Sequence, residues 1–231
     1  MVVHTLRVAV AVLAAGALLG APAGLGAQGA VSGQVTLVEK NDKPSKDLQN
    51  AVIWLEPKPA PKKPFPAMKA TVGMHGREFL PHVTVVTPGS AVKFANEDPF
   101  HHNAFSNTDM GSFDFGVADR GTSSQEIFKE PGIYPVFCDI HAKMSAYILV
   151  VPTKWFALAG VDGRFAIDSV PAGSYVLHAW HERGGERMQP VTVSAAGLGG
   201  VAMQLDARGW QKVAHKNKAG EDYYSGGGEV Y

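Results

Sequence analysis

Three side chains that bind soft metal ions stand close together in the second half of the chain. Cys138, His141 and Met144 follow one another at three-residue intervals. The residues before Cys138 are typical of a β-strand, in which side chains alternate between two faces. Tyr134 and Val136 would share one face with Cys138, and we expect that face to look into the core. The thiol is therefore expected to point inward.

The combination of thiolate, imidazole and thioether on one short turn favours copper. Thiolate and thioether suit Cu(I), imidazole suits both oxidation states, and two histidines with one cysteine and a weak methionine define a type 1 site. Cys138 is the one cysteine, so the sequence excludes an intramolecular disulfide and any zinc or iron–sulfur site that needs two cysteines. A second histidine must come from elsewhere, and the run Phe100-His101-His102-Asn103 offers two candidates.

These motifs resemble those of the cupredoxins. Cys138-x-x-His141-x-x-Met144 is similar to the ligand loop of small blue copper proteins, and its short gap is like that of amicyanin rather than plastocyanin. Upstream, Phe94-Ala95-Asn96 followed by His102-Asn103 has the spacing of the segment that supplies the first histidine ligand. The resemblance implies His102, not His101, as that ligand.

The resemblance also implies how the ligand loops are held and where this chain departs from the pattern. Asn103 would help to pin the two ligand loops together, and Asp139 would lie beside the ligands. Ala142 stands where amicyanin-like loops often carry proline, and Asp139 stands where a small hydroxyl residue is common. These two departures bear on the reduction potential more than on the choice of metal.

The rest of the chain must form the strands that position these residues. Short strand-like patterns recur between residues 31 and 206, at intervals typical of sandwiches and barrels, with turn signals between them. The expected strands are Val31–Val38, Ala51–Leu55, His82–Val86, Ala91–Phe94, Ile133–Cys138, Tyr147–Val151, Arg164–Ile167, Tyr175–Trp180 and Gln189–Val193. Ser123-x-x-Glu126 resembles a helix capping box, but its apolar run is short, so a loop is expected there. The fold class is all-β.

A second resemblance concerns the two ends of this strand region. Val31–Leu37 with Asn50–Leu55, and later Val161–Ile167 with Val170–Leu177, look like strands of a transthyretin-like or carboxypeptidase-regulatory-like sandwich. A Greek-key cupredoxin sandwich would then be inserted into this second small sandwich. The combination resembles plastocyanin-like proteins of the methylamine-utilisation type.

The expected organisation has five parts. Residues 1–27 form a signal peptide, with Arg7 before the apolar run Val8–Leu19 and small residues after it. Residues 28–66 hold the first strands of the transthyretin-like sandwich and a proline-rich linker, and 67–152 form the cupredoxin domain. Residues 153–206 complete the transthyretin-like sandwich. Residues 207–231 form a flexible tail, in which Trp210 is the residue most expected to dock.

The charge balance and the expected signal peptide limit the classes of function that fit this chain. Lys plus Arg total 21 and Asp plus Glu total 21, so the chain lacks the basic excess of a nucleic-acid binder. The apolar run is too short to span a membrane, which takes roughly 20 residues. We expect a monomer that is periplasmic or secreted after cleavage of the signal peptide, has no nucleic-acid partner and no membrane span, and meets redox proteins transiently.

The expected function is that of an exported type 1 copper protein that carries single electrons, with one copper ion bound by His102, Cys138, His141 and Met144. With these four ligands in place no coordination position stays open, so no enzyme activity is expected. Two alternatives remain at this point: a periplasmic copper-binding or donor protein, and a cell-surface binding module in which the metal is structural.

Overall fold

The computed structural model describes residues 28–212 and 215–223, and these residues form a protein built of β-strands. Within these ranges the one helical segment is the short 3-10 helix η1 (Lys40–Asp42). The prediction of an all-β fold is confirmed. No helix among these residues is long and apolar enough to cross a membrane. The expected signal peptide, residues 1–27, lies outside the described residues.

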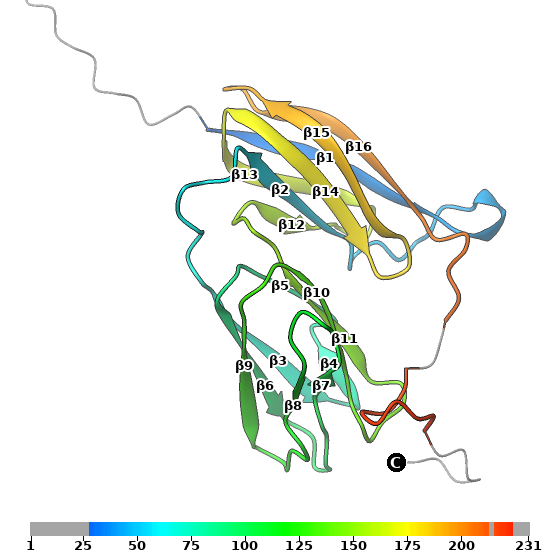
Figure 1. Cartoon of the computed structure of the whole chain (residues 1–231). Helices are drawn as coiled ribbons and strands as arrows, with labels where there is room; N and C mark the ends of the chain where they lie inside the picture. Colours follow the sequence, from blue (N-terminus) through cyan, green and yellow to red (C-terminus); the bar gives the residue numbers. More distant parts are fainter. Residues whose placement is uncertain (1–27, 213–214, 224–231) are drawn as a thin grey trace, which may run out of the picture.

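Two facing sheets form what we call the outer sandwich, whose strands are drawn in blue and teal and in yellow-green to orange in Figure 1. In the first sheet, β1 (Gln28–Val38) lies antiparallel to β13 (Arg164–Pro171) and parallel to β16 (Leu198–Asp206). The second sheet has the order β12-β2-β14-β15, with bounds Phe156–Leu158, Val52–Lys58, Gly173–His181 and Gly185–Val193. Apolar side chains from both sheets, including Leu37, Leu55 and Leu177, pack into one core.

Two further sheets form the inner sandwich, drawn in green in Figure 1, whose strands all lie between β2 and β12 in the chain. One sheet has the order β4-β3-β6-β9, with bounds Glu78–Leu80, Lys69–His75, Ser90–Asn96 and Ser123–Phe128. The other has the order β5-β11-β10-β7-β8, with bounds Val83–Val86, Ser145–Val150, Gly132–Phe137, Phe105–Ser106 and Phe113–Asp114. Their shared core contains Phe94, Val136 and Ile148.

Strand β9 differs from the sequence-based expectation of a loop at Ser123. Residues Ser123–Phe128 pair antiparallel with β6, from Ser90↔Phe128 to Ala95↔Ser123. The capping-box pattern at Ser123 and Glu126 therefore caps no helix. Because β9 lies at the edge of its sheet, pairing with β6 forms the strand without a long apolar run.

The two sandwiches meet through a third apolar cluster. Strand β2 is buried on both faces: Ile53 and Leu55 point into the outer core, while Val52 and Trp54 join side chains of the inner sandwich. The members of this cluster are Val52, Trp54, Val83, Val85, Leu149, Val151 and Trp180. An ion pair between His82 Nε2 and Glu182 Oε2, 2.8 Å long, crosses the same junction. Apolar burial and one charged contact thus hold the sandwiches together.

Candidate metal centre

Strand β10 aims Cys138 into the inner core. Tyr134 and Val136 are buried on one face of the strand, and Cys138 follows directly at its end in the same alternation. The Cys138 side chain is fully buried. The thiol therefore points inward, as the alternation predicts.

The loop after β10 folds back tightly onto its own start. Cys138 N donates to the Met144 carbonyl at 3.2 Å, and Met144 N donates to the His141 carbonyl at 3.0 Å. Strand β11 begins at the next residue, Ser145, which pairs with Phe137. Met144 is buried in the same apolar core as Cys138. Two backbone hydrogen bonds thus hold three of the four predicted ligands on one closed turn.

His102 reaches this turn from a different part of the inner sandwich. It lies in the segment after β6, and it exchanges two backbone hydrogen bonds with Ala118. His102 Nδ1 lies 3.2 Å from His141 Nδ1, and Cys138 Sγ lies 3.6 Å from His141 Nδ1. Among the residues that the structure describes, these three are the one group of metal-binding side chains whose donor atoms all lie within 4.8 Å of one another.

His101, the other candidate, lies outside this group. Its side chain is 67% exposed, and Nδ1 pairs with Asp119 Oδ1 at 2.7 Å. His102, by contrast, is fully buried. Because neighbouring residues in an extended segment point to opposite sides, only His102 faces the thiol.

The spacing of the three donor atoms fits a bound metal ion. Donors at roughly 2.0–2.3 Å from one ion in tetrahedral or trigonal geometry lie about 3.3–4.0 Å apart. The distances of 3.2 Å and 3.6 Å to His141 Nδ1 agree with that separation to within a few tenths of an ångström. One thiol and two imidazoles, with the Met144 thioether on the same loop as the thiol, form a donor set whose chemistry suits copper.

Asp98 orients His102, and the sequence did not indicate this role. His102 Nε2 lies 2.7 Å from Asp98 Oδ2. A carboxylate only accepts, so Nε2 donates this hydrogen bond and Nδ1 is the ring nitrogen that faces Cys138 and His141. The carboxylate also accepts from the backbone amides of Gly76 and Arg77 at 2.9 Å and 3.0 Å. Burial by itself would raise the pKa of Asp98, but these hydrogen bonds outweigh it and hold the pKa below its ordinary value.

Burial shifts the pKa values of two other donor groups, the Cys138 thiol and the His141 imidazole. Burial raises the pKa of the Cys138 thiol, although backbone amides of Ile140, Asn103 and His141 act in the opposite direction. Burial, followed by the proximity of His102 and Arg77, lowers the pKa of His141 below its ordinary value. The His141 imidazole is therefore neutral near pH 7 and can act as a ligand. The thiol needs a cation beside it to ionise, because thiolate is the form that binds metals.

Asn103 connects the two loops that carry the donors, as the resemblance to cupredoxins implies. Its Oδ1 accepts from the Asp139 amide at 3.3 Å, and its Nδ2 donates to Asp114 Oδ1 at 2.7 Å and to the Gly116 carbonyl at 2.8 Å. Asn103 follows His102, and Asp139 follows Cys138. One amide side chain therefore sets the separation of the two ligand segments.

Phe100 covers the histidine side of the group. Its ring lies 5.2 Å from the His102 ring and 5.9 Å from the His141 ring, both in edge arrangements. The guanidinium of Arg77 lies 5.2 Å from the Phe100 centroid. His141 is 6% exposed, so its ring is almost entirely covered.

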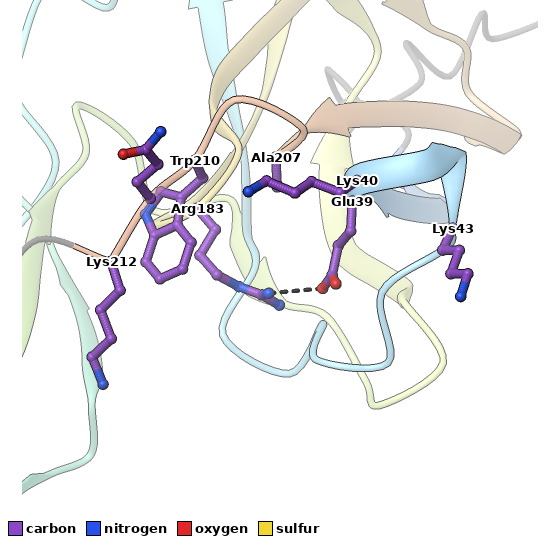
Figure 2. Close-up of a pocket in the computed structure, with 8 residues that line it drawn as sticks. Glu39, Lys40, Lys43, Arg183, Ala207, Trp210 and Lys212 are labelled. Atoms are coloured by element: carbon purple, nitrogen blue, oxygen red, sulfur yellow. Dashed lines mark hydrogen bonds and ion pairs between the residues drawn. The ribbon is translucent and has the colours of Figure 1, made fainter.

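A cavity of about 460 Å³ lies elsewhere, on the outer sandwich (Figure 2). Half of its lining residues are basic; the lining consists of Glu39, Lys40, Lys43, Arg183, Ala207, Trp210, Gln211 and Lys212. Arg183 is already bound, since it pairs with Glu39 at 2.7 Å and its guanidinium lies 5.9 Å from the Trp210 centroid. None of the predicted ligands lines this cavity, so it is separate from the candidate metal centre.

Comparison with known proteins gives partial matches to copper proteins. No family model and no curated protein matches the chain. A copper-containing nitrite reductase from Thermus scotoductus SA-01 is 30% identical over 39% of this chain and 23% of its own length, with a TM-score of 0.34. A purple cupredoxin from Nitrosopumilus maritimus is 19% identical over 36% of this chain and 99% of its own length, with a TM-score of 0.32.

Amicyanin from Paracoccus versutus is 21% identical over 43% of this chain and 97% of its own length, with a TM-score of 0.34. The chain thus spans less than a quarter of the nitrite reductase. It is similar to cupredoxin structures over only part of its own length.

Proposed function

We propose that this chain is an exported type 1 copper protein that carries single electrons between redox partners. The observation that carries the proposal is the buried group of Cys138, His102 and His141, whose ligand atoms all lie within 4.8 Å of one another, with Nδ1 of His141 3.2 Å from His102 Nδ1 and 3.6 Å from the thiol. Met144, buried on the same loop, is the proposed fourth ligand. Copper bound there would supply one-electron chemistry by alternating between Cu(I) and Cu(II).

The residues around the group favour a carrier over an enzyme. All four proposed ligands are buried, and His141, at 6%, is the most exposed of them. Four protein donors in a closed site leave no position for a substrate at the metal. One electron would enter from a donor protein and one would leave to an acceptor protein, with no bond formed or broken. The burial of every donor also argues against a copper donor, which must release its ion readily.

The proposed electron port is the His141 edge with Phe100 beside it. Phe100 is half-buried and His141 is 6% exposed, so the apolar surface at this point is small, of the kind used in weak and transient redox encounters. The formal net charge of the chain is +0, so long-range steering of a charged partner is not expected. We propose a monomeric protein in the periplasm or outside the cell.

We also propose that residues 67–152 are a cupredoxin domain inserted into a transthyretin-like sandwich. Two features support this: the strands of the inner sandwich run from residue 69 to residue 150 without interruption by outer strands, and each sandwich has its own core. The role proposed for the outer sandwich is that of a scaffold.

The proposal is tested by loading the purified protein with Cu(II) and recording visible and EPR spectra. We expect an intense thiolate-to-copper band that is lost in Cys138→Ser. His102→Ala should lose the band as well, because Nδ1 of His102 faces the thiol. His101→Ala is the matched control and should keep the band, since His101 is exposed and pairs with Asp119. A colourless wild-type adduct, or a band that survives in Cys138→Ser, would contradict the proposal.

A further inference from the structure

The end of the described chain packs against the metal centre. Residues 215–223, drawn in red in Figure 1, lie against the inner sandwich although they follow the last outer strand, β16. The Tyr223 hydroxyl donates to the carbonyl oxygen of Cys138. The sequence does not indicate this contact, because the segment has no periodic apolar residues. A direct hydrogen bond to the backbone of a proposed ligand makes this segment part of its surroundings.

Lys218 completes a closed ring of polar contacts around the two ligand loops. Its amide donates to Asp139 Oδ1 at 2.9 Å, and its Nζ pairs with Asp114 Oδ2 at 2.8 Å. Asp114 in turn accepts from Asn103 Nδ2, and Asn103 Oδ1 accepts from the Asp139 amide. The ring therefore runs through Asn103, Asp114, Lys218 and Asp139, and two of its members are the direct neighbours of His102 and Cys138.

Contacts between aromatic side chains also hold the segment against the inner sandwich. The His215 imidazole stacks on Phe137, with centroids 4.5 Å apart and planes 22° apart. Tyr223 lies edge-on to His215 at 5.1 Å, and its hydroxyl is 3.2 Å from His215 Nδ1. Phe137 directly precedes Cys138. The segment thus contacts the residue before the thiol, the thiol residue's carbonyl and the residue after it.

The segment has a folded turn of its own between these anchors. Asn217 Oδ1 accepts from the amides of Ala219 and Glu221 at 3.0 Å and 2.8 Å, and Gly220 N donates to the Asn217 carbonyl at 2.9 Å. A preformed turn loses less entropy on docking than an unstructured tail. We call residues 215–223 the strap, because their contacts hold them against the ligand loop.

We propose that residues 215–223 are a positioning element of the metal centre, with Lys218 and Tyr223 fixing the Cys138–Asp139 peptide from outside. This inference rests on the proposed function. Contacts one step removed from the ligands typically change metal affinity about 10–100-fold when they are lost, because they hold the ligands in the bound arrangement. The strap would therefore slow the loss of copper and set the environment of the thiolate.

The test compares copper transfer to a Cu(I) chelator from five full-length or shortened forms. They are the wild type, a chain ending at Lys212, Lys218→Met, Lys218→Arg and Lys216→Met. We expect transfer to be about 10–100-fold faster from the shortened chain and about tenfold faster from Lys218→Met. Lys218→Arg should keep the transfer rate close to that of the wild type, because a guanidinium can still reach the carboxylates of Asp114 and Asp139. Lys216→Met is the matched control, since among the described residues the Lys216 side chain pairs only with Asp222, at 2.5 Å, inside the segment.

A spectroscopic readout separates positioning from a merely structural role. The thiolate-to-copper band and the reduction potential should shift in the shortened chain and in Tyr223→Phe, and stay at wild-type values in Lys216→Met. Because Lys218 and Asp114 are partly exposed, high salt should raise the wild-type transfer rate toward that of Lys218→Met.

The outcomes distinguish this inference from the proposed function. A blue wild-type protein whose copper loss, spectrum and potential are unchanged in the shortened chain would overturn the strap and leave the proposed function standing. A colourless wild type would overturn the proposed function instead. In that case, hydrogen exchange of the Lys218 amide in the metal-free chain still reports docking: slow exchange that becomes fast in Asp139→Ala supports the contact, and fast exchange in both refutes it.

Discussion

Asp98 is hydrogen-bonded directly to a proposed copper ligand, His102, without being a ligand itself. Its carboxylate has three hydrogen-bond donors, the Gly76 and Arg77 amides and His102 Nε2. The two amides belong to the turn between β3 and β4, so Asp98 ties that turn to His102. A negative acceptor on Nε2 makes the imidazole a stronger donor through Nδ1, which favours Cu(II) over Cu(I).

Replacing this charge should raise the reduction potential. In Asp98→Asn the acceptor is neutral, and if Cu(II) binding weakens about tenfold relative to Cu(I), the potential rises by about 59 mV. The measurement is a redox titration of the blue band. Asp119→Asn is the control, because Asp119 pairs with exposed His101 and should leave the potential unchanged. A potential in Asp98→Asn at or below the wild-type value would refute this role.

At the scale of single residues, the sequence predicted the ligands that lie close together in the chain. It missed the residues that the fold brings to them from distant segments. Cys138, His141 and Met144 share one loop, so spacing alone brings them together. His102 could be chosen over His101 only through the resemblance to cupredoxins. Asp98 and Lys218 act through hydrogen bonds from distant segments, and such contacts leave no periodic pattern in the chain.

At the scale of elements, alternation and turn residues predicted the strands that have them. Strand β10 has buried residues at alternate positions, and the Asp162-Gly163 signal marks the turn before β13. Strand β3 (Lys69–His75) was not predicted, since its buried residues Val72, Gly73 and Met74 are consecutive and include a glycine. Strand β9 was not predicted either, because its pattern is mostly polar and Ile127 is exposed.

Gly163 shows how strongly one turn is constrained. Its φ is +77°, and a Cβ there would lie 2.1 Å from the Val35 carbonyl oxygen in neighbouring β1. Gly121 has the same φ of +77°, but a Cβ at that position would meet no atom within 4 Å. Gly163→Ala should therefore lower the free energy of unfolding by more than Gly121→Ala, in which only the backbone strain of about 1–3 kcal/mol acts. Chemical denaturation of both variants measures this, and equal losses would contradict it.

At the scale of the whole molecule, the two sandwiches are joined by an apolar cluster and by His82. Nδ1 of His82 lies 3.0 Å from the Ser145 carbonyl of the inner sandwich, and Nε2 lies 2.8 Å from Glu182 of the outer one. Both partners are acceptors, so protonated His82 satisfies both at once. The hydrogen bond to Glu182 raises the pKa of His82, against the effect of burial. The same contact lowers the pKa of Glu182.

These opposite shifts define a pH window for the junction. The contribution of His82 is complete below its unfolded pKa of 6.5 and is lost as the pH rises through the raised folded value. The contribution of Glu182 is complete above its unfolded pKa of 4.5 and is lost as the pH falls through the lowered folded value. The pair should thus stabilise the protein most between these two values.

The measurement is the loss of unfolding free energy in Glu182→Gln at two pH values, in the metal-free protein. We expect a larger loss at about pH 5.5 than at about pH 9, where His82 is neutral. In a His82→Gln background the same substitution should show little difference between the two pH values. A loss that is equal at both pH values in the wild-type background would contradict a charged contact across the junction.

The proposed ligand set is tested most directly by X-ray absorption at the copper edge of the loaded protein. We expect a coordination shell of two imidazole nitrogens and one sulfur at a short distance from copper. The contribution of this sulfur should be lost in Cys138→Ser, and that of one imidazole should be lost in His102→Ala. A wild-type shell of nitrogen and oxygen alone, unchanged in Cys138→Ser, would contradict this ligand set.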